Sequence, residues 1–152
     1  KDSDGDGLSD EWENFNDRNP TDGKLEFQFN CGGWQTEGWT GDNNVTNIAG
    51  KQGQLEFEML NPKASLKRKG LNLSPDKNTN GLAILLKCSQ PITMEFMVNG
   101  QSLMILDLPT TEEFTEYDLH DGSLGKKAIN RLELVFESPA GTVIEIDKIE
   151  AK

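Results

Sequence analysis

Hydrophobic and polar residues alternate along most of the chain. The alternation is clean over residues 25–29, 55–59 and 92–98, and one apolar face persists over residues 132–136 and 143–149. Successive side chains of a β-strand point to opposite faces of its sheet, so a period of two residues is typical of strands with one buried face. The pattern therefore predicts several half-buried strands and no long helix in this part of the chain.

Two further segments are apolar on both faces, and turn-forming residues separate all of these runs. Residues 82–86 and 103–108 have the composition of strands that are covered from both sides. Asn99-Gly100, which lies between two of the runs, is the strongest hairpin signal in the sequence. About nine or ten short strands joined by such turns predict an antiparallel β-sandwich.

A different pattern occupies the first residues, where acidic side chains recur at every second position. Residues 2–13 match the ligand positions of a twelve-residue calcium loop, and Gly7 stands where such a loop must turn sharply. The predicted ligands are Asp2, Asp4, Asp6, the carbonyl of Leu8, Asp10 and Glu13. Crowded carboxylates repel each other, and a divalent cation with roughly six to eight oxygen ligands relieves that repulsion. We therefore expect Ca²⁺ as a cofactor; the alternative is an acidic, solvated linker.

This segment resembles the EF-hand-like calcium repeats of bacterial surface proteins and the thrombospondin type 3 repeats, in which one short helix follows the loop. Here the helix would run from Ser9 to about Phe15 and stop at Asn19-Pro20. The resemblance implies a stiff spacer between modules. We therefore expect two units, residues 1–22 and residues 23–152.

The remaining residues resemble carbohydrate-binding modules with a jelly-roll fold. The matching motifs are Phe27-Gln28-Phe29, Glu37-Gly38-Trp39, Gly53-Gln54-Leu55 and the final run Ile144-Glu145-Ile146-Asp147-Lys148-Ile149. The resemblance implies a jelly-roll sandwich whose partner is a polysaccharide or oligosaccharide. It also implies a second, structural calcium between Glu26 and Asp147; the alternative is that both are solvent-facing strand residues.

Aromatic and polar side chains are the candidates for contact with a sugar. A Trp or Tyr ring can stack on the apolar face of a sugar ring, while amide, guanidinium or carboxylate groups bind the hydroxyls. The best candidate platforms are Trp34 and Tyr117, whereas Trp39 is expected in the core. Trp12 is expected to pack against the sandwich. The candidate hydroxyl-binding residues are Arg68, Asn72 and Gln101; the basic run at residues 67–69 is otherwise expected to be solvated.

Composition narrows the range of partners. The net charge is −11, from 15 basic and 26 acidic side chains. Such a field repels phosphate backbones and anionic lipids, and the apolar runs are far shorter than the roughly 20 residues that span a membrane. We therefore expect neither nucleic-acid binding nor membrane insertion. Lys1 leads directly into the acidic motif, which suggests a processed or excised piece of a longer chain.

Catalytic constellations are poorly represented. A single histidine, His120, stands in a polar, loop-like stretch and gives no redundancy for a His-based metal site or triad. Acidic pairs such as Glu56 with Glu58 could supply two carboxylates for glycoside hydrolysis, but half-exposed strand faces explain them better. Cys31 and Cys88 form either a disulfide, if the protein is exported, or two buried thiols.

We therefore expect a non-catalytic carbohydrate-binding module, secreted or on the cell surface, with a calcium-stiffened spacer. It would be part of a larger polysaccharide-active or adhesive protein, with neighbouring domains of that chain as partners. The main alternative is a structural or protein–protein interaction sandwich of a bacterial surface protein, and a second is a small glycan-cleaving enzyme. Exposure of Trp34 and Tyr117 on one surface would favour sugar binding over the structural role.

Overall fold

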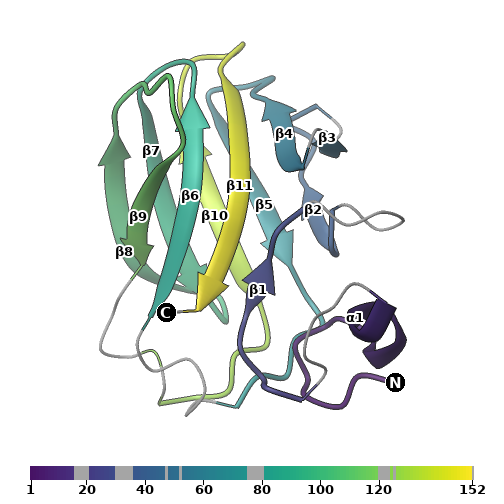
Figure 1. The fold of residues 1–152 in the computed structure, drawn as a ribbon. Helices are drawn as coiled ribbons and strands as arrows, with labels where there is room; N and C mark the ends of the chain where they lie inside the picture. Colours follow the sequence, from purple (N-terminus) through teal and green to yellow (C-terminus); the bar gives the residue numbers. More distant parts are fainter. Residues whose placement is uncertain are drawn as a thin grey trace.

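The computed structural model describes residues 1–15, 21–29, 36–46, 48–51, 53–74, 81–119, 124 and 126–151. These residues form one short helix and two antiparallel sheets that pack face to face (Figure 1). The chain is therefore an antiparallel β-sandwich, as its alternating pattern predicts.

The first sheet has six strands, in the order β3-β4-β11-β6-β9, with β1 pairing with β11. Its strands are β1 (Glu26–Phe27), β3 (Ala49–Lys51), β4 (Gln54–Glu58), β6 (Leu82–Cys88), β9 (Thr115–Leu119) and β11 (Val143–Ala151). The last strand of the chain pairs with β1, β4 and β6. It therefore joins early and middle parts of the sequence at the centre of the sheet.

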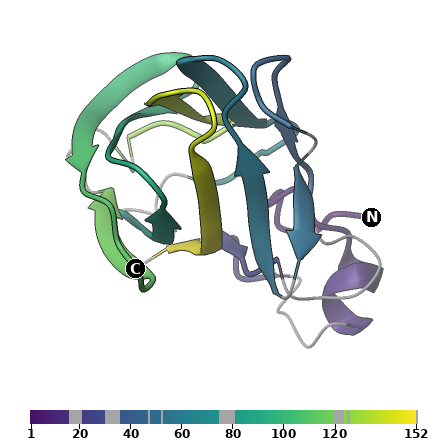
Figure 2. The same cartoon turned by 90° about the horizontal axis from the view of Figure 1, so that it is seen from above.

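The second sheet has five strands, in the order β2-β5-β10-β7-β8. Its strands are β2 (Trp39–Gly41), β5 (Lys63–Arg68), β7 (Ile92–Val98), β8 (Gln101–Leu108) and β10 (Leu132–Glu137). Figure 2 shows the two sheets from above as curved layers. Among the described strands, the edge strand β8 pairs with β7 alone.

The core lies between the sheets and is built from the apolar residues of each alternating strand. In β10 every second residue is buried: Leu132, Leu134 and Phe136. Phe136 meets Phe57 of the other sheet, with ring centroids 5.5 Å apart. Burial of apolar surface contributes roughly 25 cal/mol per Å². The alternation that marks the strands in the sequence therefore also supplies the main stabilisation of the fold.

The turn between β7 and β8 is the predicted two-residue hairpin. Asn99 and Gly100 both have positive φ angles, 53° and 83°, as a type I′ turn requires. Asn99 also binds the neighbouring chain, because its Oδ1 accepts the backbone N–H groups of Asn130 (2.8 Å) and Arg131 (3.2 Å). The strongest local turn signal in the sequence is confirmed.

Several strands differ from the sequence prediction. The described residues contain eleven strands rather than about nine or ten, because β2 and β3 are only three residues long and give no periodic signal. The stretch that contains Tyr117, predicted to be loop-like, forms β9. Residues 103–108, predicted to be covered on both faces, lie in the edge strand β8, where Ile105 is 62% exposed.

The N-terminal segment packs against one end of the sandwich, beside β1 (Figure 1). Helix α1 (Asp10–Phe15) is the short helix predicted after the acidic loop. No helix in the described part of the chain has the length and apolar character needed to cross a membrane. The backbone N–H of Asn72 donates to the carbonyl of Gly5 at 2.5 Å. The acidic loop therefore contacts the sandwich directly; the predicted helix stop, Asn19-Pro20, lies outside the described residues.

Candidate metal centre at the N-terminal loop

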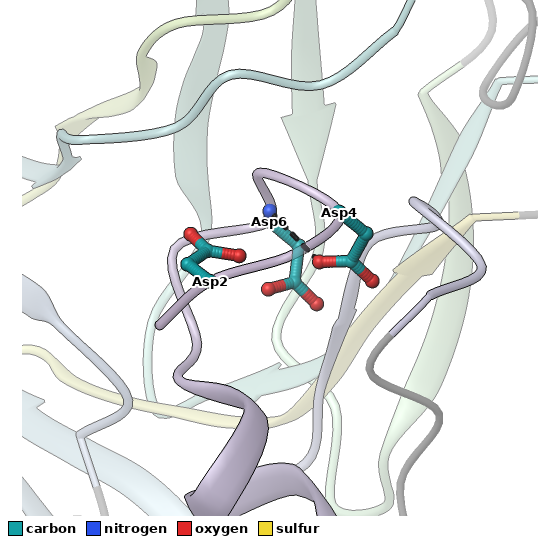
Figure 3. A group of neighbouring side chains, drawn as sticks. All are labelled: Asp2, Asp4 and Asp6. Carbon is teal, nitrogen blue, oxygen red and sulfur yellow. Dashed lines mark hydrogen bonds between the residues drawn. The ribbon is translucent and has the colours of Figure 1, made fainter.

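Three carboxylates converge in the acidic loop. Asp2, Asp4 and Asp6 each contribute a carboxylate oxygen, and these atoms all lie within 4.8 Å of one another (Figure 3). Figure 3 shows the three side chains gathered on one stretch of the loop, above helix α1. Oxygen atoms at this spacing are close enough to share a single cation.

The backbone of the loop holds these carboxylates in place. Asp2 accepts the N–H groups of Gly5 and Gly7 with its two carboxylate oxygens, each at 2.9 Å. Asp6 Oδ1 accepts the N–H of Leu8, also at 2.9 Å. Gly5 and Gly7 have φ angles of 74° and 85°, which residues with a Cβ atom adopt only with strain. The alternation of Asp and Gly therefore folds this segment into a tight, acidic loop.

Glu13 brings a fourth carboxylate to the cluster from helix α1. Ser9 caps the helix, with its Oγ accepting the N–H of Trp12 at 3.2 Å. Glu13 is 2% exposed, and its Oε1 atom has no hydrogen-bond partner among the described residues. Burial, followed by the charges of Asp6 and Asp4, raises the pKa of Glu13 to about 9. A buried carboxylate oxygen without a partner is unfavourable, and a cation held by this ligand set would supply the missing partner.

The charge on the cluster suits a hard cation. Asp6 is also buried, and burial together with the charges of Asp4 and Asp2 raises the pKa of Asp6 to about 7. Burial raises the pKa of Asp4 as well. Ca²⁺ takes carboxylate and carbonyl oxygens at about 2.3–2.6 Å and would neutralise this excess of negative charge. The donor set, all oxygen and mostly ionisable, therefore fits calcium.

The two remaining predicted loop ligands are Asp10 and the carbonyl of Leu8. Asp10 accepts the backbone N–H of Ser3 at 2.8 Å and its Oγ–H at 2.6 Å, and these bonds lower the pKa of Asp10. Its carboxylate is outside the group formed by Asp2, Asp4 and Asp6. Leu8, whose carbonyl is the other predicted ligand, buries its side chain. The structure thus brings Asp2, Asp4 and Asp6 together, places Glu13 next to Asp6 and leaves Asp10 bound to Ser3.

Arg68, a predicted hydroxyl-binding residue in a basic run, is buried beside the acidic loop. It is 4% exposed. Its guanidinium donates to the carbonyls of Glu37 (Nε, 2.8 Å), Gly7 (Nη2, 2.8 Å) and Lys69 (Nη1). Burial lowers the pKa of Arg68, and the charge of Asp6 opposes that shift. The expectation of a solvated run is wrong at Arg68, because the alternation of β5 places this residue on the inner face.

Glu37 is a second buried charge near the loop, and its role was not apparent from the sequence. Its carboxylate accepts the backbone N–H groups of Gln28, at 3.0 Å, and of Phe29. Glu37 has a φ of 50° and is fully buried. Together Arg68 and Glu37 bind the acidic loop, the end of β1 and the turn before β2 to one another. The Glu-Gly-Trp motif was the only available signal for this arrangement.

The structure places the predicted sugar-binding aromatic residues in different environments. Tyr117 lies opposite the buried Ile84 in the β9–β6 ladder and packs against the core. Trp34 lies outside the described residues. Trp39 is buried, as predicted, with its ring 5.7 Å from that of Phe27 in an edge-to-face contact. Tyr117 is therefore a half-buried neighbour of the core, and its role as a stacking platform stays a prediction.

Two predicted hydroxyl-binding residues remain at the surface. Asn72 is exposed, although its backbone N–H binds the acidic loop. Gln101 is exposed at the start of β8 and lines a cavity of about 240 Å³. The cavity is bounded by Val98, Asn99, Gln101, Leu103, Leu124, Lys126, Lys127 and Ile129. Gln101 is thus the predicted hydroxyl-binding residue that borders a cavity in the described structure.

The predicted second calcium site lies between the terminal strands. Glu26 faces Glu150 in the β1–β11 ladder, and Asp147 lies where the β11–β6 register shifts. Lys148 forms an ion pair with Glu150 at 2.9 Å. Within the described ranges, the groups of three or more possible ligands that could share an ion are confined to the N-terminal loop. The site between Glu26 and Asp147 stays a prediction.

Of the other residues singled out from the sequence, some are described by the structure and some are not. Cys88 is a buried thiol in β6, with its Sγ 3.4 Å from the carbonyl oxygen of Pro109. Cys31 and His120 lie outside the described residues. Glu56 is half-buried and faces Glu145 across the β4–β11 ladder. Both glutamates belong to the outer face of the first sheet, as the alternation predicts.

Comparisons with known proteins relate the chain to carbohydrate-binding modules through its fold. No protein-family model and no curated protein sequence matches the chain. A solved carbohydrate-binding module of family 29 matches with a TM-score of 0.54 at 14% identity, over 84% of this chain and 87% of that chain. A CBM29-2 mutant complexed with cellulohexaose matches with a TM-score of 0.54 at 15% identity, over 84% and 89%. PfGH50B matches with a TM-score of 0.57 at 12% identity, over 74% of this chain and 22% of that chain. At these identities the similarity establishes a shared sandwich fold.

Proposed function

We propose that this chain is a non-catalytic, carbohydrate-binding β-sandwich stabilised by Ca²⁺ at its N-terminal loop. The observation that carries the metal site is the buried, unpartnered Oε1 of Glu13 beside three converging aspartates. The sugar-binding role is supported by the fold that the chain shares with family 29 modules. We place the protein outside the cell, as one module of a larger polysaccharide-active or adhesive chain.

The residues that would hold calcium are Asp2, Asp4, Asp6 and Glu13. Leu8, through its carbonyl, and Asp10 are the further ligands that the loop pattern predicts. Calcium in this position supplies charge neutralisation and rigidity and takes no part in a reaction. Extracellular calcium modules bind with dissociation constants of about 10⁻⁴–10⁻³ M, which is the range in which we expect this site to titrate.

The proposed carbohydrate partner is a polysaccharide or oligosaccharide. One of the structural neighbours is complexed with cellulohexaose. In the present chain the cavity at Gln101 combines an apolar floor, which includes Val98 and Ile129, with polar groups from Gln101 and Lys127. An apolar floor with a few polar groups at its rim is typical of small-ligand sites. This cavity is therefore our candidate for a sugar subsite.

A polysaccharide affinity gel and a glycan array, both run on calcium-loaded protein, test the proposal. We expect retention by at least one polysaccharide. Gln101→Ala should weaken binding by roughly 5- to 10-fold, the loss of one hydrogen bond of about 1 kcal/mol. Gln90→Ala is the matched control, because Gln90 is equally exposed but lies at the opposite end of β7. Silence across the panel, with calcium binding intact, would reject the sugar-binding role.

A structural module is the second candidate, and one observation favours it. Among the described aromatic residues, only Phe15, at the end of helix α1, is exposed; its side chain is 86% exposed. Trp39 and Tyr117 pack in or against the core. The described part of the sandwich, which does not include Trp34, presents no fully exposed ring on its faces, and such faces would suit a spacer or a docking surface between neighbouring domains. Retention of calcium binding without retention by any glycan would support this role.

A further inference from the structure

Arg68 joins three separate segments of the chain at the edge of the acidic loop. Its guanidinium donates to Gly7 in the loop, to Glu37 in the turn before β2 and to Lys69 at the end of β5. The guanidinium carbon also lies 5.7 Å from the centre of the Phe27 ring in β1. One buried side chain thus contacts the loop and strands of both sheets.

The surrounding backbone is fitted closely around this guanidinium. A Cβ atom built on Gly7 would lie 2.4 Å from Arg68 Nη2, and one built on Gly38 would lie 2.6 Å from Arg68 Cζ. Both glycines also have positive φ angles. The loop and the turn before β2 therefore approach Arg68 from two sides at distances that only glycine permits.

The same guanidinium places a buried positive charge beside the acidic cluster. The charges of Asp6 and Asp2 both act on Arg68. When all four carboxylates are ionised, as calcium binding requires, they carry four negative charges. Arg68 offsets one of these charges and a divalent ion offsets two, which leaves an excess of one. Arginine presents five donors in a rigid, planar fork, and lysine could not reproduce bonds to three carbonyls in fixed directions.

We propose that Arg68 is the positioning residue through which calcium in the N-terminal loop stabilises the sandwich. The loop and the sandwich then form one cooperative unit rather than a spacer and a separate domain. The proposal rests on the proposed calcium site. Calcium orders the carboxylates around Gly7, Arg68 holds the Gly7 carbonyl, and Glu37 passes the restraint to residues 28 and 29.

The first experiment compares Arg68→Lys with Arg131→Lys in the full chain. Both variants keep the charge, and Arg131 lies just before β10, where its backbone N–H binds Asn99 of the β7–β8 turn rather than the acidic loop. Calorimetric titration with CaCl₂ should show roughly 5- to 100-fold weaker binding for Arg68→Lys and unchanged binding for Arg131→Lys. The calcium-induced rise in Tm should shrink for Arg68→Lys alone. A purely structural arginine would lower the Tm equally with calcium and with chelator, which would overturn the proposal.

The second experiment uses the unmodified protein and so does not depend on a variant that folds. Hydrogen–deuterium exchange is measured with CaCl₂ and with chelator. We expect calcium to slow exchange at Asn72, which donates to Gly5, at Phe29, which donates to Glu37, and at Trp39, which donates to Thr36 at 3.0 Å. Amides of the edge strand β8 should not change. Protection confined to residues 2–13 would overturn the coupling.

The outcomes separate this proposal from the calcium site on which it rests. Absence of any heat on titrating unmodified protein with CaCl₂ would reject the calcium site itself. Binding by unmodified protein together with equal affinity in Arg68→Lys would reject only the role of Arg68. Weaker binding in Arg68→Lys, together with protection that extends to Phe29 and Trp39, would support both.

Discussion

The Nη2 atom of Arg68 lies 2.8 Å from the carbonyl oxygen of Gly7, and 61 residues separate the two in the chain. Arg68 ends strand β5, and Gly7 forms the sharp turn of the acidic loop. The conformation of the loop therefore depends on the sandwich. The division into residues 1–22 and 23–152 follows the change in composition along the sequence, but the packing crosses that boundary.

Gly7→Ala should destabilise the protein more than Gly70→Ala. The two glycines have similar φ angles, 85° and 77°, but a Cβ atom on Gly70 would lie 4.0 Å from Arg68 Nη1, whereas one on Gly7 would lie 2.4 Å from Arg68 Nη2. A left-handed conformation costs a non-glycine residue about 1–2 kcal/mol, and overpacking adds about 1–3 kcal/mol. Urea denaturation should therefore give about 1–2 kcal/mol for Gly70→Ala and about 2–5 kcal/mol for Gly7→Ala.

Equal losses in the two alanine variants would contradict this prediction. That result would mean that Arg68 can move away from Gly7 without penalty. The measurement should be made in chelator as well as in calcium, because a displaced loop also binds the cation less well. The extra loss in Gly7→Ala should persist in chelator, since the clash with Arg68 does not depend on metal.

Glu13→Gln should have opposite effects in the presence and absence of calcium. In the metal-free protein the pKa of Glu13 is raised from 4.5 to about 9. The folded state therefore holds a proton that the unfolded state has lost. The associated stability is full below pH 4.5 and is lost as the pH rises through about 9. Gln cannot ionise, so in chelator at pH 8–9 the variant should be more stable, by on the order of 1 kcal/mol or about 2–4 °C in Tm.

With saturating CaCl₂ the order should reverse, because the variant lacks the expected bidentate ligand and gains little from the cation. Glu11→Gln is the matched control, since Glu11 lies on the same helix, carries the same charge and is exposed. Differential scanning fluorimetry from pH 5 to pH 9 checks both halves of the prediction. A Glu13→Gln protein that follows Glu11→Gln under both conditions would show that Glu13 is not part of the metal site.

The sandwich could be predicted because successive side chains of a strand point to opposite faces, and this property sets both the alternation in the sequence and the burial in the structure. Burial alternates strictly over residues 92–98, and these residues form β7 with the predicted bounds. Asn99-Gly100 supplies the two positive φ angles that the next turn needs. Short strands such as β2 and β3 escaped prediction because three residues cannot show a period. The edge position of β8 escaped it because strand order is set by pairing between distant segments.

The acidic loop was predictable because its ligands are close together in the sequence. Asp2, Asp4 and Asp6 are brought together by local turns at Gly5 and Gly7. The contacts of Arg68 and Asn72 with this loop were not predictable, since they bring together residues more than sixty positions apart. A basic run in an acidic protein suggested solvation or a ligand, whereas the register of β5 directs its arginine inward.

Two isoleucines allow the assignment of edge and centre to be tested. Ile146 lies in the central strand β11 and is fully buried, whereas Ile105 lies in the edge strand β8 and is largely exposed. Ile146→Thr should cost about 2–4 kcal/mol, because a hydroxyl replaces buried apolar volume. Ile105→Thr should stay within about 0.5 kcal/mol. Urea denaturation checks both values, and a large loss for Ile105→Thr would mean that a partner or a further segment covers β8.

Tyr117 offers the sharpest separation of a sugar platform from a core residue. Because Tyr117 packs against the core opposite Ile84, we expect Tyr117→Ala to lower the free energy of unfolding by about 2–3 kcal/mol. The affinity of the folded variant for any retained polysaccharide should remain within about twofold of the unmodified protein, because a residue packed against the core does not contact the ligand. A twofold change is far smaller than the tenfold change that 1.4 kcal/mol produces. Glu116→Ala is the control, because Glu116 is the exposed neighbour on the outer face of the same strand. A Tyr117→Ala protein that keeps its stability and loses its polysaccharide would instead make Tyr117 a stacking platform and place the sugar on the sheet that contains β9.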